Sequence, residues 1–85
     1  MQNNHILLSN MEDGQEGIII EIKGGRGLLN QCDRIGIRIG KNIKKISQQP
    51  IWGPVIFEQD NMKIAIGFRM ASKILIDLDF SRKSS

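Results

Sequence analysis

A chain of 85 residues with 40% hydrophobic and 25% charged residues has the composition of one small, ordinary soluble domain. Its net charge of +3 does not require a nucleic-acid partner, and its single cysteine excludes an internal disulfide. No segment approaches the roughly 18 apolar residues of a membrane span and the start lacks a signal-peptide pattern, so we expect a cytoplasmic protein whose contact with any membrane is indirect or peripheral.

The chain is expected to form a single domain over residues 1–80, followed by a flexible tail at residues 81–85. With no Tyr, one Trp and three Phe, its core must be built mainly from isoleucine and leucine, which favours strands over helices. His5 is expected to lie in a flexible end.

The first predicted turn follows this end. Ser9 and Glu12 have the spacing of a capping box on a single helical turn. Leu7 or Leu8, together with Met11, is predicted to form a lid on the core.

Residues 17–40 are predicted to form a strand, a glycine turn, a short helix and a second turn, to which the other strands are added. Ile18, Ile20 and Ile22 alternate with residues of the other face, the period of a strand with one side against a core. The glycines that follow favour a tight reversal with Arg26 at its exposed tip.

The predicted helix carries one apolar stripe. Leu28, Cys32 and Ile35 are spaced i, i+4 and i+7, with Leu29 beside them. Gly36 stands where a left-handed residue ends a helix.

A strand is predicted from Lys41 to Gln48. Ile43 and Ile46 lie three residues apart and cannot both face inward on a regular strand, so a bulge is expected near Lys44 and Lys45.

The second half of the chain is predicted to be a hairpin, one helical turn and a last strand. The loop 49–54, bracketed by the only two prolines, carries Trp52. Residues 55–66 alternate on either side of a turn, residues 68–73 suit one helical turn, and residues 74–78 form the last strand. About five short strands with glycine corners predict a strongly bent sheet that closes into a small barrel.

Several segments at fixed spacing form a distinctive ensemble. They are Asp13-Gly14 with Gly17, the strand IIIEIKGG, the helix GLLNQCDRIGI, the Gly40 turn, the PIWGPV segment and the run KIAIGFRMASKILI. This ensemble resembles the ferrous iron transport protein A (FeoA) family over roughly residues 7–78. Lys45 departs from the family pattern, since an apolar residue is usual there, which predicts an exposed or bulged edge.

The resemblance implies a mainly β, SH3-like barrel with one short helix after the first long strand. It also implies a cytoplasmic accessory protein that docks on a FeoB-type permease, a membrane GTPase, during ferrous iron uptake. The family has no established catalytic residues to carry over. The same fold resembles the C-terminal domain of iron- and manganese-dependent repressors.

The candidate partner-binding residues are Arg26, Leu29 and Arg34, on or beside the exposed side of the helix, and Trp52 in the proline-bracketed loop. Trp and Arg are enriched in binding hot spots. The alternative is that Leu29 and Trp52 simply cover the core, because scattered exposed apolar residues are normal.

No catalytic residue, metal ligand or cofactor is predicted. His5 and Cys32 belong to separate elements without a close ligand pair, and Cys32 fits better as a small core residue. Asp77 and Asp79 are interpreted as a solvated face. Whether the chain ever holds a metal ion stays open.

Two other functions remain as alternatives. A small nucleic-acid-binding barrel would use Arg38, Lys41, Lys44 and Lys45, although nucleic acid is the less favoured partner. A detached regulatory domain would bind a peptide or a repressor. Weak self-association through exposed strand edges also stays open.

Overall fold

The computed structural model describes residues 4–80 of the chain. The strands are β1 (His5–Leu7), β2 (Glu16–Ile22), β3 (Asn42–Gln48), β4 (Val55–Gln59), β5 (Met62–Ile66) and β6 (Ile74–Asp77). The helices are α1 (Arg26–Ile35) and α2 (Phe68–Ala71), and the short 3-10 turns are η1 (Leu8–Asn10) and η2 (Leu78–Phe80). The predicted flexible tail, residues 81–85, lies outside the described residues.

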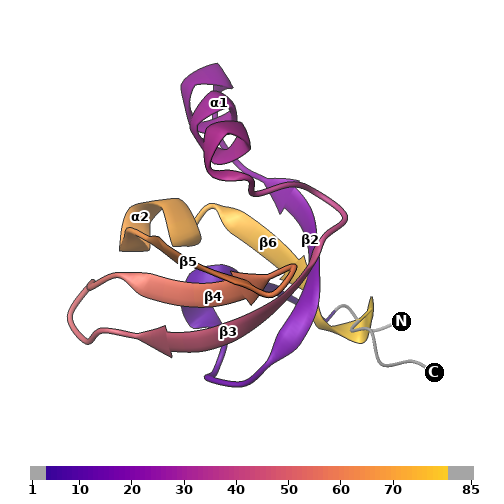
Figure 1. Ribbon diagram of the computed structural model, residues 1–85, viewed down its shortest axis with the longest axis vertical. Helices are drawn as coiled ribbons and strands as arrows, with labels where there is room; N and C mark the ends of the chain where they lie inside the picture. The colour runs from indigo at the N-terminus through magenta and orange to yellow at the C-terminus, as the bar shows by residue number, and fades with distance from the viewer. Residues whose placement is uncertain (1–3, 81–85) are drawn as a thin grey trace.

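The strands form one antiparallel sheet in the order β1-β6-β2-β3-β4-β5. The sheet bends around a single core, with α1 at one end and α2 beside the β4–β5 hairpin (Figure 1). The prediction of a mainly β, SH3-like fold with one short helix after the first long strand is confirmed.

Strand β1 was not among the five predicted strands. It pairs with the last strand, β6, and its partners are His5 with Asp77, Ile6 with Ile76 and Leu7 with Leu75. The expectation that His5 lies in a flexible end is therefore wrong. Three residues are too few to show a periodicity, so the strand could not be recognised locally.

Apolar side chains, most of them aliphatic, from all parts of the described chain make the core. Leu8 is fully buried and Met11 is 4% exposed, which confirms that they cover the core as a lid. The buried hydrophobic residues are Leu8, Met11, Ile19, Cys32, Ile37, Ile43, Val55, Phe57, Ile64, Ile66, Ala71, Ile74 and Ile76.

In β2 a bulge changes which residues face the core. Ile19 is fully buried, whereas Ile18 and Ile20 are only half-buried. The register between β2 and β6 shifts between Ile19 and Glu21, which brings Ile22 back against the core. A simple alternation of isoleucines did not reveal this change of face.

Close packing of β2 on β6 requires glycine at position 17. A Cβ atom on Gly17 would collide with the side chain of Ile76 and lie 2.8 Å from the carbonyl oxygen of Asp77. The backbones of the two strands therefore approach more closely than any residue with a side chain allows.

The predicted capping box is absent from the described turn η1. Ser9 is buried, and no side chain caps the turn. The backbone N–H of Glu12 instead donates to Oε1 of Gln15 at 2.7 Å. The Ser-x-x-Glu spacing was therefore coincidental.

Helix α1 ends as predicted. Gly36 adopts a left-handed conformation with φ 104°, and its N–H and that of Ile37 donate to the carbonyls of Asp33 and Cys32. The side-chain amide of Gln59 donates to the carbonyl of Gly36 at 2.7 Å, which ties the end of the helix to β4.

The β4–β5 hairpin and α2 also follow the prediction. Asp60 and Asn61 both have positive φ, as a two-residue hairpin turn requires. Ala71 is fully buried, so its small side chain lets α2 pack closely on the sheet.

Candidate functional site

Helix α1 presents most of its surface to solvent. It stands at one end of the bent sheet (Figure 1), and Cys32 is its only buried residue. Arg26 and Arg34 are exposed and Leu29 is 43% exposed, so these candidates lie on the open side of the helix. The exposed position of Leu29 therefore does not favour the alternative in which this residue simply covers the core.

Cys32 anchors the inner side of α1. Its side chain is 1% exposed, and burial raises the pKa of its thiol above the ordinary value. A buried, protonated thiol is a poor nucleophile and a poor metal ligand, so Cys32 serves packing.

Trp52 lies at the tip of the connection between β3 and β4. It is 72% exposed and the neighbouring Ile51 is 85% exposed, so neither residue covers the core. Both have positive φ, 56° for Ile51 and 62° for Trp52, which is an uncommon conformation for bulky residues. The Trp52 ring meets the Phe68 ring edge-on, with centroids 4.7 Å apart. This turn displays two large apolar side chains at a cost in backbone strain.

A groove lies between α1 and α2. It lies between the candidate residues on α1 and the turn that carries Trp52. Its volume is about 360 Å³. It is lined by Leu28, Gln31, Gly67, Arg69, Met70 and Lys73. Phe68 begins α2, next to the groove-lining residues Gly67 and Arg69, and its ring contacts Trp52. The groove and the β3–β4 turn are therefore neighbours on the protein surface.

Sequence reasoning missed the groove. Arg69 and Lys73 lie four residues apart and flank Met70. The available signal was this pair of basic residues close to an apolar residue, at α2 and just after its end. It was overlooked because the segment was considered only for its packing.

Lys45 lies inside the protein. It is 1% exposed, and its ammonium group donates to the carbonyls of Leu8 at 3.2 Å and Met11 at 2.7 Å, and to Oε1 of Gln48 at 2.7 Å. Of the two alternatives predicted for Lys45, the exposed edge is wrong. The predicted bulge is confirmed, since the register between β3 and β4 shifts between Lys45 and Ser47.

Burial has a measurable consequence for Lys45. It lowers the pKa of the ammonium below the ordinary value of 10.5, and the negative charge of Asp13 partly opposes this change. The ammonium thus fastens the η1 segment to β3 from within.

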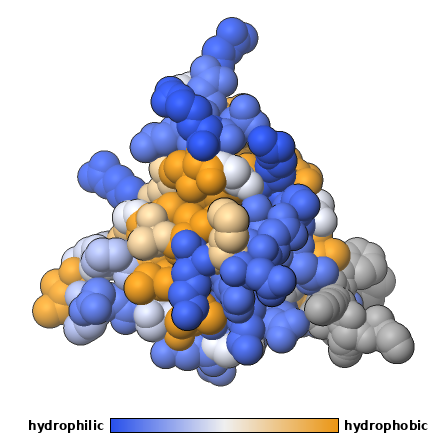
Figure 2. All heavy atoms as spheres, in the orientation of Figure 1, coloured by the Kyte–Doolittle hydropathy of each residue, from blue (hydrophilic) through white to orange (hydrophobic). Residues whose placement is uncertain are grey.

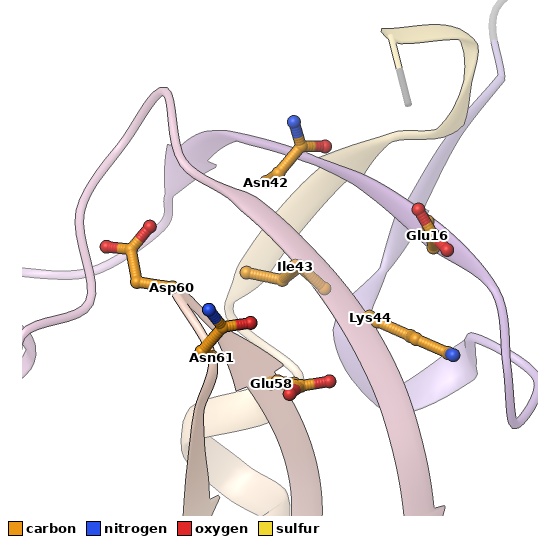
Figure 3. A pocket seen from close by; sticks show the side chains of 7 residues that line it. All are labelled: Glu16, Asn42, Ile43, Lys44, Glu58, Asp60 and Asn61. Atoms are coloured by element: carbon orange, nitrogen blue, oxygen red, sulfur yellow. The ribbon is translucent and has the colours of Figure 1, made fainter. Parts of the chain in front are cut away.

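The basic surface required by the nucleic-acid alternative is not assembled. Lys45 is buried, Lys41 pairs with Asp60 at 3.0 Å, and Arg38 lies 3.4 Å from Asp33. Lys44 lines a pocket of about 330 Å³ together with several acidic and amide groups (Figure 3). The residues that line it are Glu16, Asn42, Ile43, Lys44, Glu58, Asp60 and Asn61. Carboxylates around Lys44 oppose phosphate binding there.

Asp77 and Asp79 do not form a simple solvated face. The Asp77 side chain is 13% exposed, its Oδ2 lies 3.7 Å from Nε2 of His5, and its Oδ1 accepts from the backbone N–H of Asp79. Asn4 donates to Asp79 at 2.7 Å. These contacts hold β1 and the end of β6 together.

Within residues 4–80, no three His, Cys, Asp or Glu side chains gather in a way that could hold a metal ion. Among the same residues, no helix is long and apolar enough to cross a membrane.

Residues 6–78 match the family model of the FeoA domain. The chain belongs to the FeoA family. This FeoA chain is 36% identical over 66 residues to a protein of Methanocaldococcus jannaschii that carries the name Fe(2+) transport protein A, and the match covers 78% of each chain. The FeoA family comprises small accessory proteins of ferrous iron transport.

Solved structures share the fold. A crystal structure described as iron uptake regulatory protein (FeoA) has a TM-score of 0.79 and 27% identity. The match covers 86% of the present chain and 96% of the chain in that crystal structure. A manganese-dependent transcriptional repressor has a TM-score of 0.82 and 18% identity over 92% of the FeoA chain, but only 44% of the repressor is matched. The repressor likeness concerns the fold of one part of that protein.

Proposed function

We infer that this chain is a non-enzymatic, cytoplasmic accessory protein of ferrous iron uptake that docks on a FeoB-type membrane GTPase permease. The observation that carries the proposal is the match to the FeoA domain over residues 6–78, nearly the whole described chain. The relative named Fe(2+) transport protein A supports the same assignment.

The docking surface in this proposal comprises α1 and the β3–β4 turn. Arg26, Leu29 and Arg34 contribute charge and apolar area from a helix that is open to solvent, and Trp52 contributes a large aromatic anchor. Association would bury exposed apolar side chains while arginines pair with acidic groups of the partner. Such docking needs neither a nucleophile nor a cofactor.

The test is co-purification of the tagged chain with the detergent-solubilised permease. Arg26→Glu, Leu29→Asp and Trp52→Ala should each reduce the amount of permease retained. Lys44→Glu is the matched control, because Lys44 lies in the separate pocket of Figure 3 and should leave retention unchanged.

Two results would count against the proposal. Permease retention that is unaffected by all three changes would remove the proposed surface. Failure of the unmodified chain to retain the permease, in detergent and with nucleotide present, would remove the permease as partner.

A further inference from the structure

The groove between α1 and α2 has an apolar floor. Leu28 and Met70 are each half-buried against the core and still line the groove. Gly67 carries no side chain, so the groove remains open beside it. Figure 2 shows apolar atoms gathered beneath α1 on this face, bounded by hydrophilic side chains.

The polar residues that line the groove are cationic or neutral. Arg69 and Lys73 are exposed and take part in no ion pair within residues 4–80, and no acidic residue lines the groove. Lys23 approaches the same region, since its backbone N–H donates to the carbonyl of Lys73 at 2.7 Å. Carboxylates brought into the groove would thus meet uncompensated positive charge.

The apolar floor and the two basic side chains together indicate which kind of ligand fits the groove. A free phosphate would use Arg69 and Lys73 but leave Leu28 and Met70 without a partner. A membrane surface is too broad to enter a concave space, and no aromatic residue lines the groove to stack a nucleic-acid base. At about 360 Å³, the groove has room for a few side chains of a peptide segment.

We propose that the groove between α1 and α2 binds an acidic segment of a protein partner, with a large apolar side chain inserted between Leu28 and Met70 and carboxylates paired with Arg69 and Lys73. The groove adjoins Phe68, whose ring contacts Trp52, so one partner can engage the groove and the β3–β4 turn together. The inference rests on the proposed function in one respect, since that function identifies the partner as the permease.

A defined peptide tests the recognition chemistry on the full chain. The probe is a fluorescein-labelled helical peptide with leucines on one face and glutamates on the other, and binding is followed by fluorescence anisotropy. We expect saturable binding that weakens with added salt and is lost when serine replaces every leucine.

Charge reversal then locates the site. Arg69→Glu combined with Lys73→Glu should weaken peptide binding about tenfold or more, because two attractive contacts become repulsive. The same variant should gain binding of a peptide in which lysine replaces every glutamate. Lys44→Glu combined with Lys63→Glu changes the net charge equally but alters no groove residue, and should bind like the unmodified chain. Circular dichroism checks that each variant is folded.

The outcomes separate this inference from the proposed function. Permease retention that depends on Arg26 and Trp52 but is indifferent to reversal at Arg69 and Lys73, with no peptide binding, overturns the groove inference and leaves the permease assignment standing. Groove-dependent peptide binding without permease retention upholds the groove chemistry and removes the permease. Equal loss of peptide binding in both double variants, or groove-dependent binding to phosphatidylglycerol vesicles in place of the peptide, also overturns the inference.

Discussion

Replacement of Lys45 by methionine should destabilise the protein although it removes a buried charge. Methionine matches the length and the apolar stem of lysine, so the change creates little cavity. It removes three hydrogen bonds, to the carbonyls of Leu8 and Met11 and to the side chain of Gln48. Whether the unfolding free energy falls or rises depends on whether these three acceptors find other hydrogen-bond donors.

The three acceptors differ in the other hydrogen-bond donors that each can reach. The carbonyl of Leu8 still accepts from the N–H of Met11 at 3.2 Å, and the half-buried side chain of Gln48 can turn to water. The carbonyl of Met11 loses the only donor found for it within residues 4–80. An orphaned buried acceptor costs about 1–3 kcal/mol, which is also the loss of unfolding free energy that we expect for Lys45→Met. A loss of about 1 kcal/mol corresponds to a fall in Tm of roughly 4–8 °C in a domain of this size.

Urea denaturation followed by far-UV circular dichroism measures this loss. Lys44→Met is the matched control, because the adjacent side chain points to solvent and its replacement should change the unfolding free energy by less than about 0.5 kcal/mol. Limited proteolysis should also cut the η1 segment faster in Lys45→Met than in the control.

A Lys45→Met variant as stable as the unmodified protein, or more stable, would refute this reasoning. It would mean that release from the desolvation of a buried ammonium outweighs the lost hydrogen bonds, as happens when some buried charges are replaced by apolar residues.

Three further predictions concern single residues. Burial lowers the pKa of Lys45 only in the folded state, so the unfolded chain binds more protons below pH 10.5. The unfolding free energy of the unmodified protein should therefore rise with pH in the alkaline range relative to that of Lys45→Met. A difference in unfolding free energy between the two proteins that does not change with pH, measured by urea titration, would contradict this. The Cys32 thiol, buried and with a raised pKa, should react with a chromogenic disulfide reagent far more slowly in the native protein than in urea, and equal rates would show that α1 opens readily. Gly17→Ala should cost about 2 kcal/mol or more in thermal unfolding, because the new methyl group collides with Ile76 and Asp77 of β6. Gly27→Ala, in an open helical position, should stabilise by up to about 1 kcal/mol. Similar effects of the two changes would mean that β2 and β6 are not so closely packed.

Local patterns were sufficient to predict most of the fold. The left-handed Gly36, the Asp60-Asn61 hairpin and the packing of Ala71 each follow from a few adjacent residues. Strand β1 and the bulge at Ile20 depend on pairing with β6, which is more than fifty residues away in sequence for both. Neither leaves a local signal.

The site was predicted less completely than the fold. Exposure of Arg26, Leu29, Arg34 and Trp52 follows from helical periodicity and from the position of a turn, but whether they bind a partner stays a prediction. The groove arises where two helices approach, and a sequence read element by element does not show it. Lys45 was misplaced because a lysine on a strand is ordinarily exposed, and only the tertiary structure brings backbone carbonyls to its ammonium.

The position of β6 also bears on how the protein is made. β6 pairs with both β1 and β2, yet it is the last of these strands in sequence. During synthesis the two earlier strands leave the ribosome without the partner that joins them, so the sheet cannot close until residue 77 has emerged. Assembly from such distant segments is intrinsically slow. We therefore expect the native sheet to close only after β6 has emerged, with β1 and η1 docking among the final steps.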